Sequence, residues 1–307
     1  MKKSITFLFF LFCFAEAISQ CMPSYGFAIK TLQIDSVKIA YVEKGKGQTL
    51  LMVHGLGGNA SHWKRNIEEL SKQYRCIAID LPGYGSSDKI VKEDASKQLD
   101  FYSDIIIAAI KKLKLKEVVL VGHSMGGQIV MIAALKEPKL IKKLVLIAPA
   151  GLETFSATEA ALLKNYATPA FYEKQDSTAL ANVYKMNFFK MPVEAEQLVK
   201  DRIALKQCST YNKYCQSISA GVQGMLGHPV KDELKKLLQP TLILFGENDV
   251  LIPNKLLHPK MTIADVATVG KEIKNSKVVM IPKAGHLLQF EKPTEVNDAI
   301  KKFINKK

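Results

Sequence analysis

The residues best suited to chemistry in this chain surround Ser124. Residues 122–127 read Gly-His-Ser-Met-Gly-Gly, with an apolar strand pattern before them at 118–121 and a helical pattern after them that ends near Lys136. A G-x-S-x-G turn between a strand and a helix is so tight that glycines must flank it, and it exposes the serine hydroxyl. This context predicts that Ser124 is a nucleophile, with a purely structural glycine-rich turn as the alternative.

A serine hydroxyl is a weak nucleophile and needs a neighbouring base. Of the six histidines, His286 is best placed, because it lies in the loop between the last predicted strand and the last predicted helix. His54 and His123 lie in glycine-rich turns, where we expect them to orient other groups rather than transfer protons. The remaining three fit a surface or structural role: His62 early in the first helix, and His228 and His258 directly before prolines.

The base in turn needs a carboxylate that holds its tautomer and stabilises the imidazolium. Asp249 is the predicted partner, because residues 245–249, Phe-Gly-Glu-Asn-Asp, end the seventh predicted strand. Glu247 is the nearest rival, and Glu153, after the sixth strand, is a more remote one. The chain order is then serine, aspartate, histidine, which is the order that accompanies this type of serine turn.

The tetrahedral intermediate of acyl transfer carries an oxyanion, which backbone N–H groups stabilise. We expect one donor from Met125, directly after the nucleophile. The other is expected from the loop 54–58, His-Gly-Leu-Gly-Gly, where the glycines allow the backbone to turn inward and Leu56 is the predicted donor. A plain turn is the alternative interpretation of this loop.

The candidate site residues follow different predicted strands, so the fold must bring the ends of these strands together. Along the chain, strand patterns alternate with helix patterns. Several strand candidates are short continuous apolar runs, which is typical of strands buried on both faces. The alternation predicts an α/β fold with a mostly parallel, eight-stranded sheet flanked by helices. Asp35-Ser36 alone joins the first two strands, so the sheet should begin with an antiparallel hairpin. The predicted strands are 27–34, 37–42, 49–53, 75–79, 117–121, 144–147, 241–245 and 277–281, and the predicted helices are 60–73, 97–113, 125–136 and 294–304.

Residues 152–238 interrupt the alternation, because they show no strong strand pattern and are rich in aromatic side chains. We interpret them as a helical lid inserted after the sixth strand, between the core segments 21–151 and 239–307. The aromatic residues would either fill the insertion's own core or line a pocket over the site. The substrate-contacting residues predicted from this arrangement are Leu56, His123, Phe155, Phe188, Phe189 and Leu287.

Residues 1–20 have the layout of a secretory signal peptide, with a basic start at Lys2 and Lys3, an apolar run over 5–15 and a small-x-small pattern at 15–17. The apolar run is shorter than the roughly 20 residues that span a bilayer. An uncleaved anchor is therefore the less favoured alternative. The prediction is a protein exported to the periplasm or secreted.

Export would permit disulfides among the cysteines that remain after cleavage. Cys208 and Cys215 are too far apart for a bond if one continuous helix holds both, so a disulfide between them requires a turn. Cys76 lies in an apolar strand pattern and is expected to be a buried thiol. Residues 18–21, Ile-Ser-Gln-Cys, weakly resemble a lipidation motif, which leaves a lipoprotein anchored at Cys21 as an alternative location.

The net charge of +14 comes almost wholly from lysine, since only Arg65, Arg75 and Arg202 among the 43 basic residues are arginines. Nucleic-acid readers depend on arginine for bidentate contacts, so we expect no nucleic-acid partner. The lysines are spread along the chain, which is typical of a solvated surface. Attraction to anionic membranes is the alternative, so peripheral membrane contact stays open.

Several motifs together resemble the α/β-hydrolase superfamily, in its lid-bearing branch. They are the loop 54–58, the segment 80–87 (Asp-Leu-Pro-Gly-Tyr-Gly-Ser-Ser), the Ser124 turn, the segment 246–249 and Gly285-His286. The resemblance covers nearly all of the chain after the signal segment, and it implies the fold, the lid and a triad of Ser124, Asp249 and His286. One departure is the 36 residues between Asp249 and His286, an excess that would add a helix near the site.

Residues 124–128 together with 149–152 are similar to monoacylglycerol-lipase-type members and to hydrolases of carbon–carbon bonds. We therefore expect a serine hydrolase that cleaves small-molecule carboxylic esters through an acyl-enzyme, with no metal and no cofactor. The first alternative is a carbon–carbon bond hydrolase with the same triad. Such enzymes act on acidic substrates, and Arg202 in the lid is the obvious cation to bind one, although Arg202 also fits a solvated helix residue. The second alternative is a non-catalytic ligand-binding protein. Ser124 excludes the aspartate-nucleophile enzymes of this fold.

Overall fold

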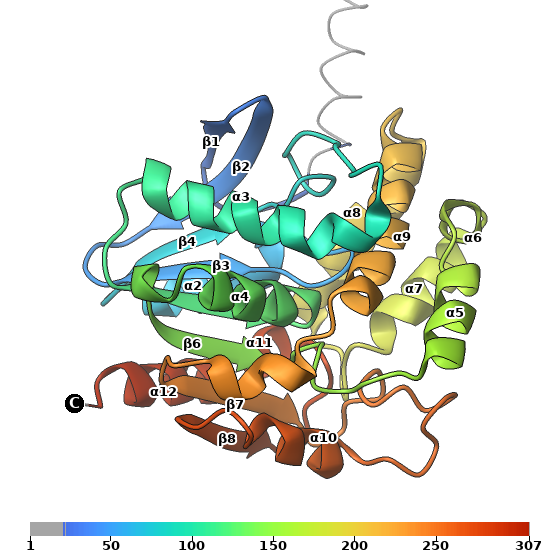
Figure 1. Cartoon of the computed structure of the whole chain (residues 1–307). Helices are drawn as coiled ribbons and strands as arrows, with labels where there is room; N and C mark the ends of the chain where they lie inside the picture. Colours follow the sequence, from blue (N-terminus) through green and yellow to red (C-terminus); the bar gives the residue numbers. More distant parts are fainter. Residues whose placement is uncertain (1–20, 22, 307) are drawn as a thin grey trace, which may run out of the picture.

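The computed structural model describes residue 21 and residues 23–306, so the predicted signal peptide lies outside the described residues. Eight strands form one sheet in the order β1-β2-β4-β3-β5-β6-β7-β8 (Figure 1). β1 is antiparallel to β2 and β2 to β4, and the later neighbours pair in parallel, as the sequence predicts. The strands are β1 (Ile29–Ile34), β2 (Val37–Lys44), β3 (Thr49–Val53), β4 (Arg75–Ile79), β5 (Val118–His123), β6 (Ile141–Ile147), β7 (Thr241–Gly246) and β8 (Ser276–Ile281).

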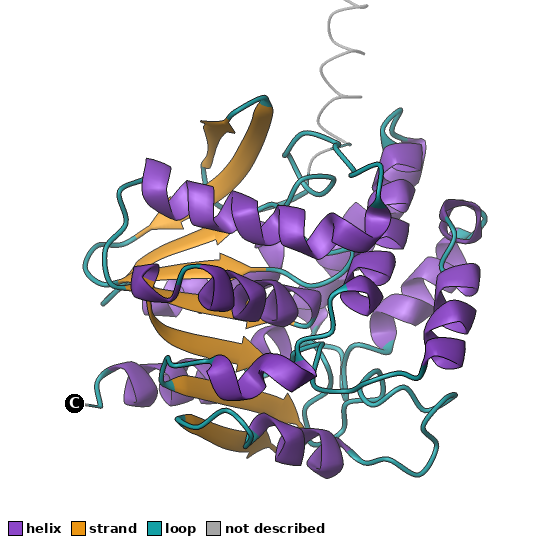
Figure 2. Ribbon diagram, in the orientation of Figure 1, coloured by secondary structure: helices purple, strands orange, loops and turns teal. Residues whose placement is uncertain are grey.

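Helices cover both faces of the sheet (Figure 2). α3 (Gln98–Lys112) and α4 (Met125–Lys136) pack against each other on one face. α2 (Lys64–Leu70), α11 (Leu288–Glu291) and α12 (Pro293–Ile304) form a second group on the opposite face. The predicted first helix is divided, because the 3-10 turn η1 (Ala60–Trp63) precedes α2; similar turns lie at η2 (Ala95–Lys97) and η3 (Pro138–Leu140).

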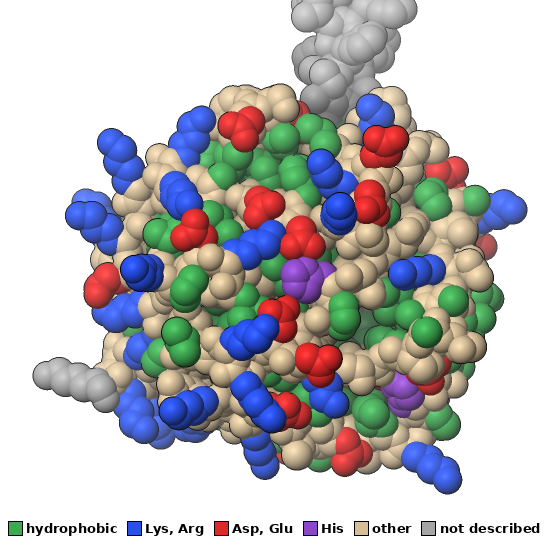
Figure 3. All heavy atoms as spheres, viewed as in Figure 1, with side chains coloured by type: hydrophobic (Ala, Val, Ile, Leu, Met, Phe, Trp, Pro, Cys, Tyr) green, Lys and Arg blue, Asp and Glu red, His purple; other side chains and the backbone are tan. Residues whose placement is uncertain are grey.

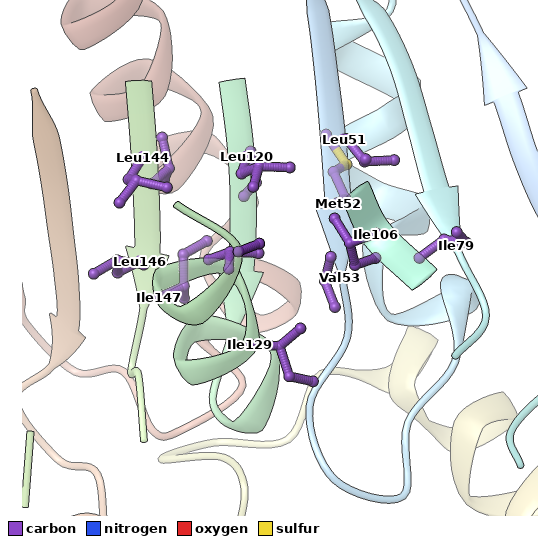
Figure 4. Close-up of a cluster of buried hydrophobic side chains, with 14 of the residues drawn as sticks. Leu51, Met52, Val53, Ile79, Ile106, Leu120, Ile129, Leu144, Leu146 and Ile147 are labelled. Atoms are coloured by element: carbon purple, nitrogen blue, oxygen red, sulfur yellow. The ribbon is translucent and has the colours of Figure 1, made fainter. Parts of the chain in front are cut away.

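The central strands carry the hydrophobic core. All residues of β3, β5 and β7 are buried. α4 packs against β3, β5 and β6, and its residues 125–134 are buried as well. Figure 4 shows side chains from this region, including Leu51 of β3, Leu120 of β5 and Ile129 of α4. Burial on both faces explains why these strands read as unbroken apolar runs instead of alternating patterns.

Between β6 and β7 the described chain forms helices and turns, which lie within the segment 152–238, called the lid from here on. Helix α9 (Tyr211–Gly227) packs on α3 and joins the main core through Tyr214, Cys215 and Ile218. Tyr184 and Phe188 instead belong to a separate, smaller cluster of buried residues. The helices of this lid are α5 (Ala157–Tyr166), α6 (Pro169–Glu173), α7 (Ser177–Lys185), α8 (Glu196–Ala204) and α9 (Tyr211–Gly227), with 3-10 turns η4 (Val193–Ala195), η5 (Leu205–Gln207) and η6 (Lys231–Lys236).

A short N-terminal strap, formed by residues 21 and 23–25, joins the lid to the core. Cys21 forms a disulfide with Cys208, with the two Cα atoms 5.7 Å apart. The Ser24 N–H donates to the Asp201 carboxylate of α8 (2.8 Å). The Tyr25 hydroxyl donates to the buried carboxylate of Asp80, in the loop after β4. The strap therefore contacts α8, the segment after it and the core at once.

The structure contradicts a disulfide between Cys208 and Cys215. Cys208 pairs with Cys21, and Cys215 is a free thiol inside α9, where it is fully buried in the main core. The helix begins at Tyr211, so Cys208 lies before it and faces the N-terminal strap instead. Cys76 is a free buried thiol, as predicted. Because one sulfur cannot hold a disulfide and a lipid together, this bond and lipidation of Cys21 exclude each other.

The surface has mixed charges. Figure 3 shows basic side chains scattered over one face with acidic side chains between them. This distribution agrees with the interpretation of the lysines as a solvated surface. Within the part of the chain that the structure describes, no helix is both long and apolar enough to cross a membrane.

Peptide mapping of the purified protein without reductant should find Cys21 linked to Cys208. We expect Cys76 and Cys215 to resist alkylation until the protein is unfolded, because both thiols are buried and burial raises the pKa of Cys76 to about 12. Mass spectrometry before and after denaturant measures this directly. A cross-linked peptide that joins Cys208 to Cys215 would contradict the structure.

Candidate active site

Ser124 stands at the sharp turn between β5 and α4. Its backbone has a φ of 53° and a ψ of −121°, a conformation that a serine rarely adopts. A Cβ on Gly122 would lie 2.4 Å from the Gly126 carbonyl oxygen, so glycine is required there. The Ser124 N–H donates to the Ile147 carbonyl of β6 (2.9 Å), which helps to hold the strained turn. The turn places the hydroxyl at the N-terminus of α4, where the helix dipole favours negative charge.

Ser124 lines a cavity of about 650 Å³ between the carboxyl ends of the strands and the lid. Ligand sites of this kind typically measure about 300–1,000 Å³ and carry a few polar groups on a mostly apolar wall. The apolar part of the wall comes largely from the lid and includes Leu163, Leu180, Ile218, Val222, Met225 and Leu226. The cavity is therefore suited to a small molecule with an apolar chain.

His286 lines the same cavity and is held by Asp249. The His286 Nδ1 lies 2.7 Å from the Asp249 Oδ2, and both side chains are buried. The second carboxylate oxygen of Asp249 accepts the N–H groups of Leu251 (2.8 Å) and Ile252 (3.1 Å). A carboxylate fixed in this way accepts the Nδ1 proton of His286 and leaves Nε2 as the nitrogen that can act as a base.

The two rival carboxylates lie elsewhere. Glu247 is exposed. Glu153 also lines the cavity, but its Oε1 accepts the Asn254 N–H (2.8 Å) and lies 2.5 Å from the Nδ1 of His258. The structure thus brings Asp249, of the three predicted candidates, to His286.

The loop 54–58 approaches the Ser124 turn closely. A Cβ on Gly55 would lie 2.9 Å from both the Ser124 Cβ and the His123 Nδ1, so the approach requires glycine. The loop closes as a turn in which the Gly58 N–H donates to the Gly55 carbonyl (3.0 Å). Among the described residues, no protein acceptor takes the N–H of Leu56 or Met125. The oxyanion role of these two N–H groups stays a prediction.

His54 and His123 hold backbone groups around the site, as expected for orienting residues. The Leu81 N–H donates to the His54 Nε2 (3.1 Å), so Nδ1 carries the proton and donates to the Gly55 carbonyl (2.8 Å). The His123 Nε2 donates to the His286 carbonyl (3.0 Å), because a carbonyl can only accept. Burial lowers the pKa of His54 to about 4 and that of His123 well below its usual range. Both rings are therefore neutral at pH 7.

Four of the six predicted substrate contacts line the cavity: Leu56, His123, Phe155 and Leu287. The prediction is wrong for Phe188 and Phe189. Phe188 is buried in the small cluster of the lid, and Phe189 is about half exposed. The chain turns after α7, so Asn187 reaches the cavity while the two phenylalanines point elsewhere. The lid's aromatic residues thus serve both of the roles considered, a lid core and a cavity wall.

Sequence reasoning missed a polar group on the cavity wall. The His62 Nε2 lies 2.6 Å from the Tyr184 hydroxyl, and both side chains line the cavity. Burial lowers the pKa of His62 to about 3. Arg202 also lines the cavity, where it is partly buried and lies over the Tyr184 ring. No local pattern could have indicated this group, because its members come from three distant segments.

The long segment between Asp249 and His286 does add a helix, α10 (Ile263–Gly270), which packs against β7 and β8. The loop before it reaches the cavity through Leu251, Ile252 and Asn254. Among the described residues, no group of three or more histidine, cysteine, aspartate or glutamate side chains could hold a metal ion.

Comparison with known proteins places this geometry in context. The profile of one protein family, described as alpha/beta hydrolase fold, matches residues 48–293. A dihydrolipoyllysine-residue acetyltransferase component of an acetoin cleaving system from Pseudomonas putida is 29% identical over 85% of this chain, which spans 65% of that protein. An (E)-2-((N-methylformamido)methylene)succinate hydrolase from Acinetobacter baylyi is 28% identical, over 90% of this chain and 97% of its own. A 2-hydroxymuconate semialdehyde hydrolase from Pseudomonas sp. is 27% identical, over 81% of this chain and 84% of that protein.

Solved structures share the same architecture. A probable hydrolytic enzyme from Pseudomonas aeruginosa superposes with a TM-score of 0.81 at 22% identity, over 94% of this chain and all of the other. An esterase from Exiguobacterium antarcticum superposes with a TM-score of 0.72 at 21% identity, over 90% of this chain and 99% of its own. At these identities the likeness concerns the fold.

The buried neutral histidines predict a loss of stability in mild acid. Histidines of the unfolded chain titrate near pH 6.5, whereas His54 and His62 in the native protein stay neutral to about pH 4 and about pH 3. The unfolded state therefore binds protons that the native state does not. The free energy of unfolding should fall as the pH falls from 6.5 to 5, by up to about 1.4 kcal/mol per pH unit for each histidine.

Urea unfolding at several pH values between 7.5 and 5 measures this slope. His62→Gln should make the slope shallower, whereas Ser36→Ala, which replaces an exposed side chain that does not titrate, should not. Equal slopes in the wild-type protein and in His62→Gln would contradict the assignment of His62 as a neutral native residue.

Proposed function

Because the chain belongs to the alpha/beta hydrolase fold family, we propose that it is a serine hydrolase that cleaves carboxylic esters. The observation that carries the proposal is one apolar cavity that holds the strained Ser124 turn and the buried pair of His286 and Asp249. Leu56 lines the same cavity and Met125 directly follows Ser124, and no backbone acceptor outside the helices and strands takes the N–H of either among the described residues. This set matches what acyl transfer from an ester requires.

In the proposed reaction the Ser124 Oγ attacks the ester carbonyl carbon while the His286 Nε2 takes the hydroxyl proton. The N–H groups of Leu56 and Met125 stabilise the oxyanion of the tetrahedral intermediate. His286 then returns the proton to the leaving alcohol, and an acyl-enzyme remains on Ser124. Water activated by His286 releases the acid and restores the serine. Asp249 keeps the imidazole in the correct tautomer and stabilises its charged form.

A carbon–carbon bond hydrolase is the second candidate, since a 2-hydroxymuconate semialdehyde hydrolase is among the relatives. Another relative, a hydrolase of a substituted succinate, also acts on an acid. An acidic substrate of that kind requires a cation in the cavity. Arg202 is already engaged by a backbone carbonyl and two aromatic rings, and Lys231 lines the cavity beside Asp232. This arrangement favours a neutral acyl ester over a dicarboxylate.

The proposal includes export to an oxidising compartment. The disulfide between Cys21 and Cys208 supports it, because structural disulfides are rare in reducing cytosol. A free Cys21 sulfur in the mature protein would be required for lipidation instead. Peripheral contact with anionic membranes is also retained as part of the proposal, on the ground of the net charge of +14.

Ser124→Ala should reduce the kcat for p-nitrophenyl butyrate by roughly 10⁴-fold or more, since loss of the nucleophile removes the whole covalent route. Asp249→Asn should reduce it by about 10⁴-fold, because the His286 tautomer is lost. Ser36→Ala, at the exposed tip of the β1–β2 hairpin, is the control and should match the wild-type protein. Unchanged hydrolysis by Ser124→Ala would refute the proposal, and failure of a fluorophosphonate to label Ser124 would favour a non-catalytic binding protein.

A substrate panel separates the two hydrolase classes. We expect kcat/KM for neutral p-nitrophenyl esters to exceed that for a dienoate ring-cleavage product, because the cavity wall is mostly apolar and Arg202 is engaged. Release of p-nitrophenol and bleaching of the dienoate are both read by absorbance. A higher kcat/KM for the dienoate would assign the site to carbon–carbon cleavage.

A further inference from the structure

Two lid side chains converge on one backbone carbonyl of the loop 54–58. The Arg202 Nη2, from α8, donates to the Gly57 carbonyl oxygen. The Tyr214 hydroxyl, from α9, donates to the same oxygen (2.9 Å). The Arg202 guanidinium also lies over the Tyr214 ring, 4.9 Å from its centroid. The Gly57 carbonyl thus accepts one charged and one neutral hydrogen bond. These two bonds fix its direction firmly, because a charge-assisted hydrogen bond is about twice as strong as a neutral one.

The loop is built to accept these donors. Gly57 has a φ of +68°, which favours glycine, and a Cβ there would lie 2.5 Å from the Arg202 Nη2 and 3.1 Å from the Tyr214 hydroxyl. Any other residue at this position would both strain the backbone and displace the two lid side chains. The contact between lid and loop thus depends on the absence of a side chain at Gly57.

A chain of peptide groups connects this carbonyl to the predicted oxyanion donor. The peptide that carries the Gly57 carbonyl also carries the Gly58 N–H, which donates to the Gly55 carbonyl (3.0 Å). The Gly55 carbonyl in turn shares its peptide with the Leu56 N–H. In a trans peptide the C=O and N–H point in opposite directions, so fixing the carbonyl fixes the N–H. Hydrogen bonds in such a chain also polarise one another.

From this arrangement we propose that Arg202 and Tyr214 are positioning residues of the oxyanion loop, so that the lid completes the catalytic site as well as covering the cavity. The inference rests on the proposed function, because it assigns the Leu56 N–H as an oxyanion donor. Arg202 suits the task better than lysine would, since its planar group can stack on Tyr214 and donate to Gly57 at the same time.

The N-terminal strap extends this link to Cys21. Asp201, next to Arg202 in α8, accepts the Ser24 N–H (2.8 Å), and the disulfide joins Cys208, shortly after α8, to Cys21. Tyr25 fixes the strap to Asp80 in the core. The strap thus holds α8 against the core, and through Arg202 it holds the loop 54–58.

The test compares lid variants by their kinetics on a neutral ester. Arg202→Ala should lower kcat by about 10–100-fold, below the 10²–10³-fold that is typical for loss of an oxyanion donor itself, with KM changed by less than about 3-fold. Tyr214→Phe should lower kcat by a smaller factor, and Arg202→Lys should restore part of the loss. The rate of phosphonylation by a fluorophosphonate should fall in parallel, because that reaction also passes through an oxyanion held by the loop.

Arg65→Ala is the matched control. Arg65 also donates to a backbone carbonyl, that of Phe290 (2.9 Å), and lies over the Phe290 ring, but both of these contacts are made outside the loop 54–58. It should keep a kcat within about 3-fold of the wild-type value. Circular dichroism melting verifies that each variant is folded; if Arg202→Ala does not fold, Tyr214→Phe decides. Equal kcat in Arg202→Ala, Tyr214→Phe and Arg65→Ala, with Ser124→Ala inactive, would overturn the positioning role while leaving the esterase proposal intact.

An ester with a carboxylate at the end of its acyl chain separates positioning from direct substrate binding. If Arg202→Ala raises KM for the acidic ester and leaves kcat for the neutral ester unchanged, Arg202 is a substrate ligand and the proposal fails.

Cys208→Ser tests the strap. It should lower kcat in the wild-type background and have little further effect in the Arg202→Ala background. Fully additive losses would overturn the link between strap and loop.

Discussion

The structure depends on a steric constraint at the carboxyl edge of the sheet, where the loops that follow neighbouring strands meet with no room for side chains between them. In the parallel pair of β3 and β5, Val53 lies opposite Gly122, so the loop 54–58 and the Ser124 turn leave the sheet side by side. A Cβ on Gly126 would lie 2.4 Å from the Val53 carbonyl oxygen. Because glycine occupies these positions, the backbones of the loop 54–58 and the Ser124 turn approach each other more closely than any larger residue would allow.

The same constraint operates between β7 and β8. A Cβ on Gly246 would lie 2.4 Å from the Ala284 carbonyl oxygen and 2.3 Å from that of Gly285, so the ends of the two strands are in close backbone contact. This contact brings Asp249 and His286 together although 36 residues separate them. The lid then closes the edge, and its engagement of Gly57 joins it to the loop rather than leaving it as a detached cover. Catalytic geometry, lid position and the N-terminal strap are thus mechanically connected.

The parts of the site that sequence analysis predicted are those with local causes. A glycine-flanked serine between a strand and a helix has few structural alternatives, and a histidine in the last loop follows from strand order. The predictions that the structure contradicts depend on side-chain direction or on distant partners. Phe188 and Phe189 lie in a turn after α7, where no helical period indicates which side chain faces the cavity. Cys208 pairs with a cysteine 187 residues away, which its spacing from Cys215 could not indicate.

The sequence by itself determined the order of strands and helices along the chain, the serine turn, the glycine-rich loop 54–58 and the choice of His286, because each depends on residue types within a few positions of one another. Only the tertiary structure decided which carboxylate meets His286, that His62 and Tyr184 form a polar wall, and that Arg202 and Tyr214 reach Gly57. The physical reason is that these contacts join segments that are far apart along the chain. Their separation in sequence does not indicate their distance in space, which the packing of the lid on the sheet sets.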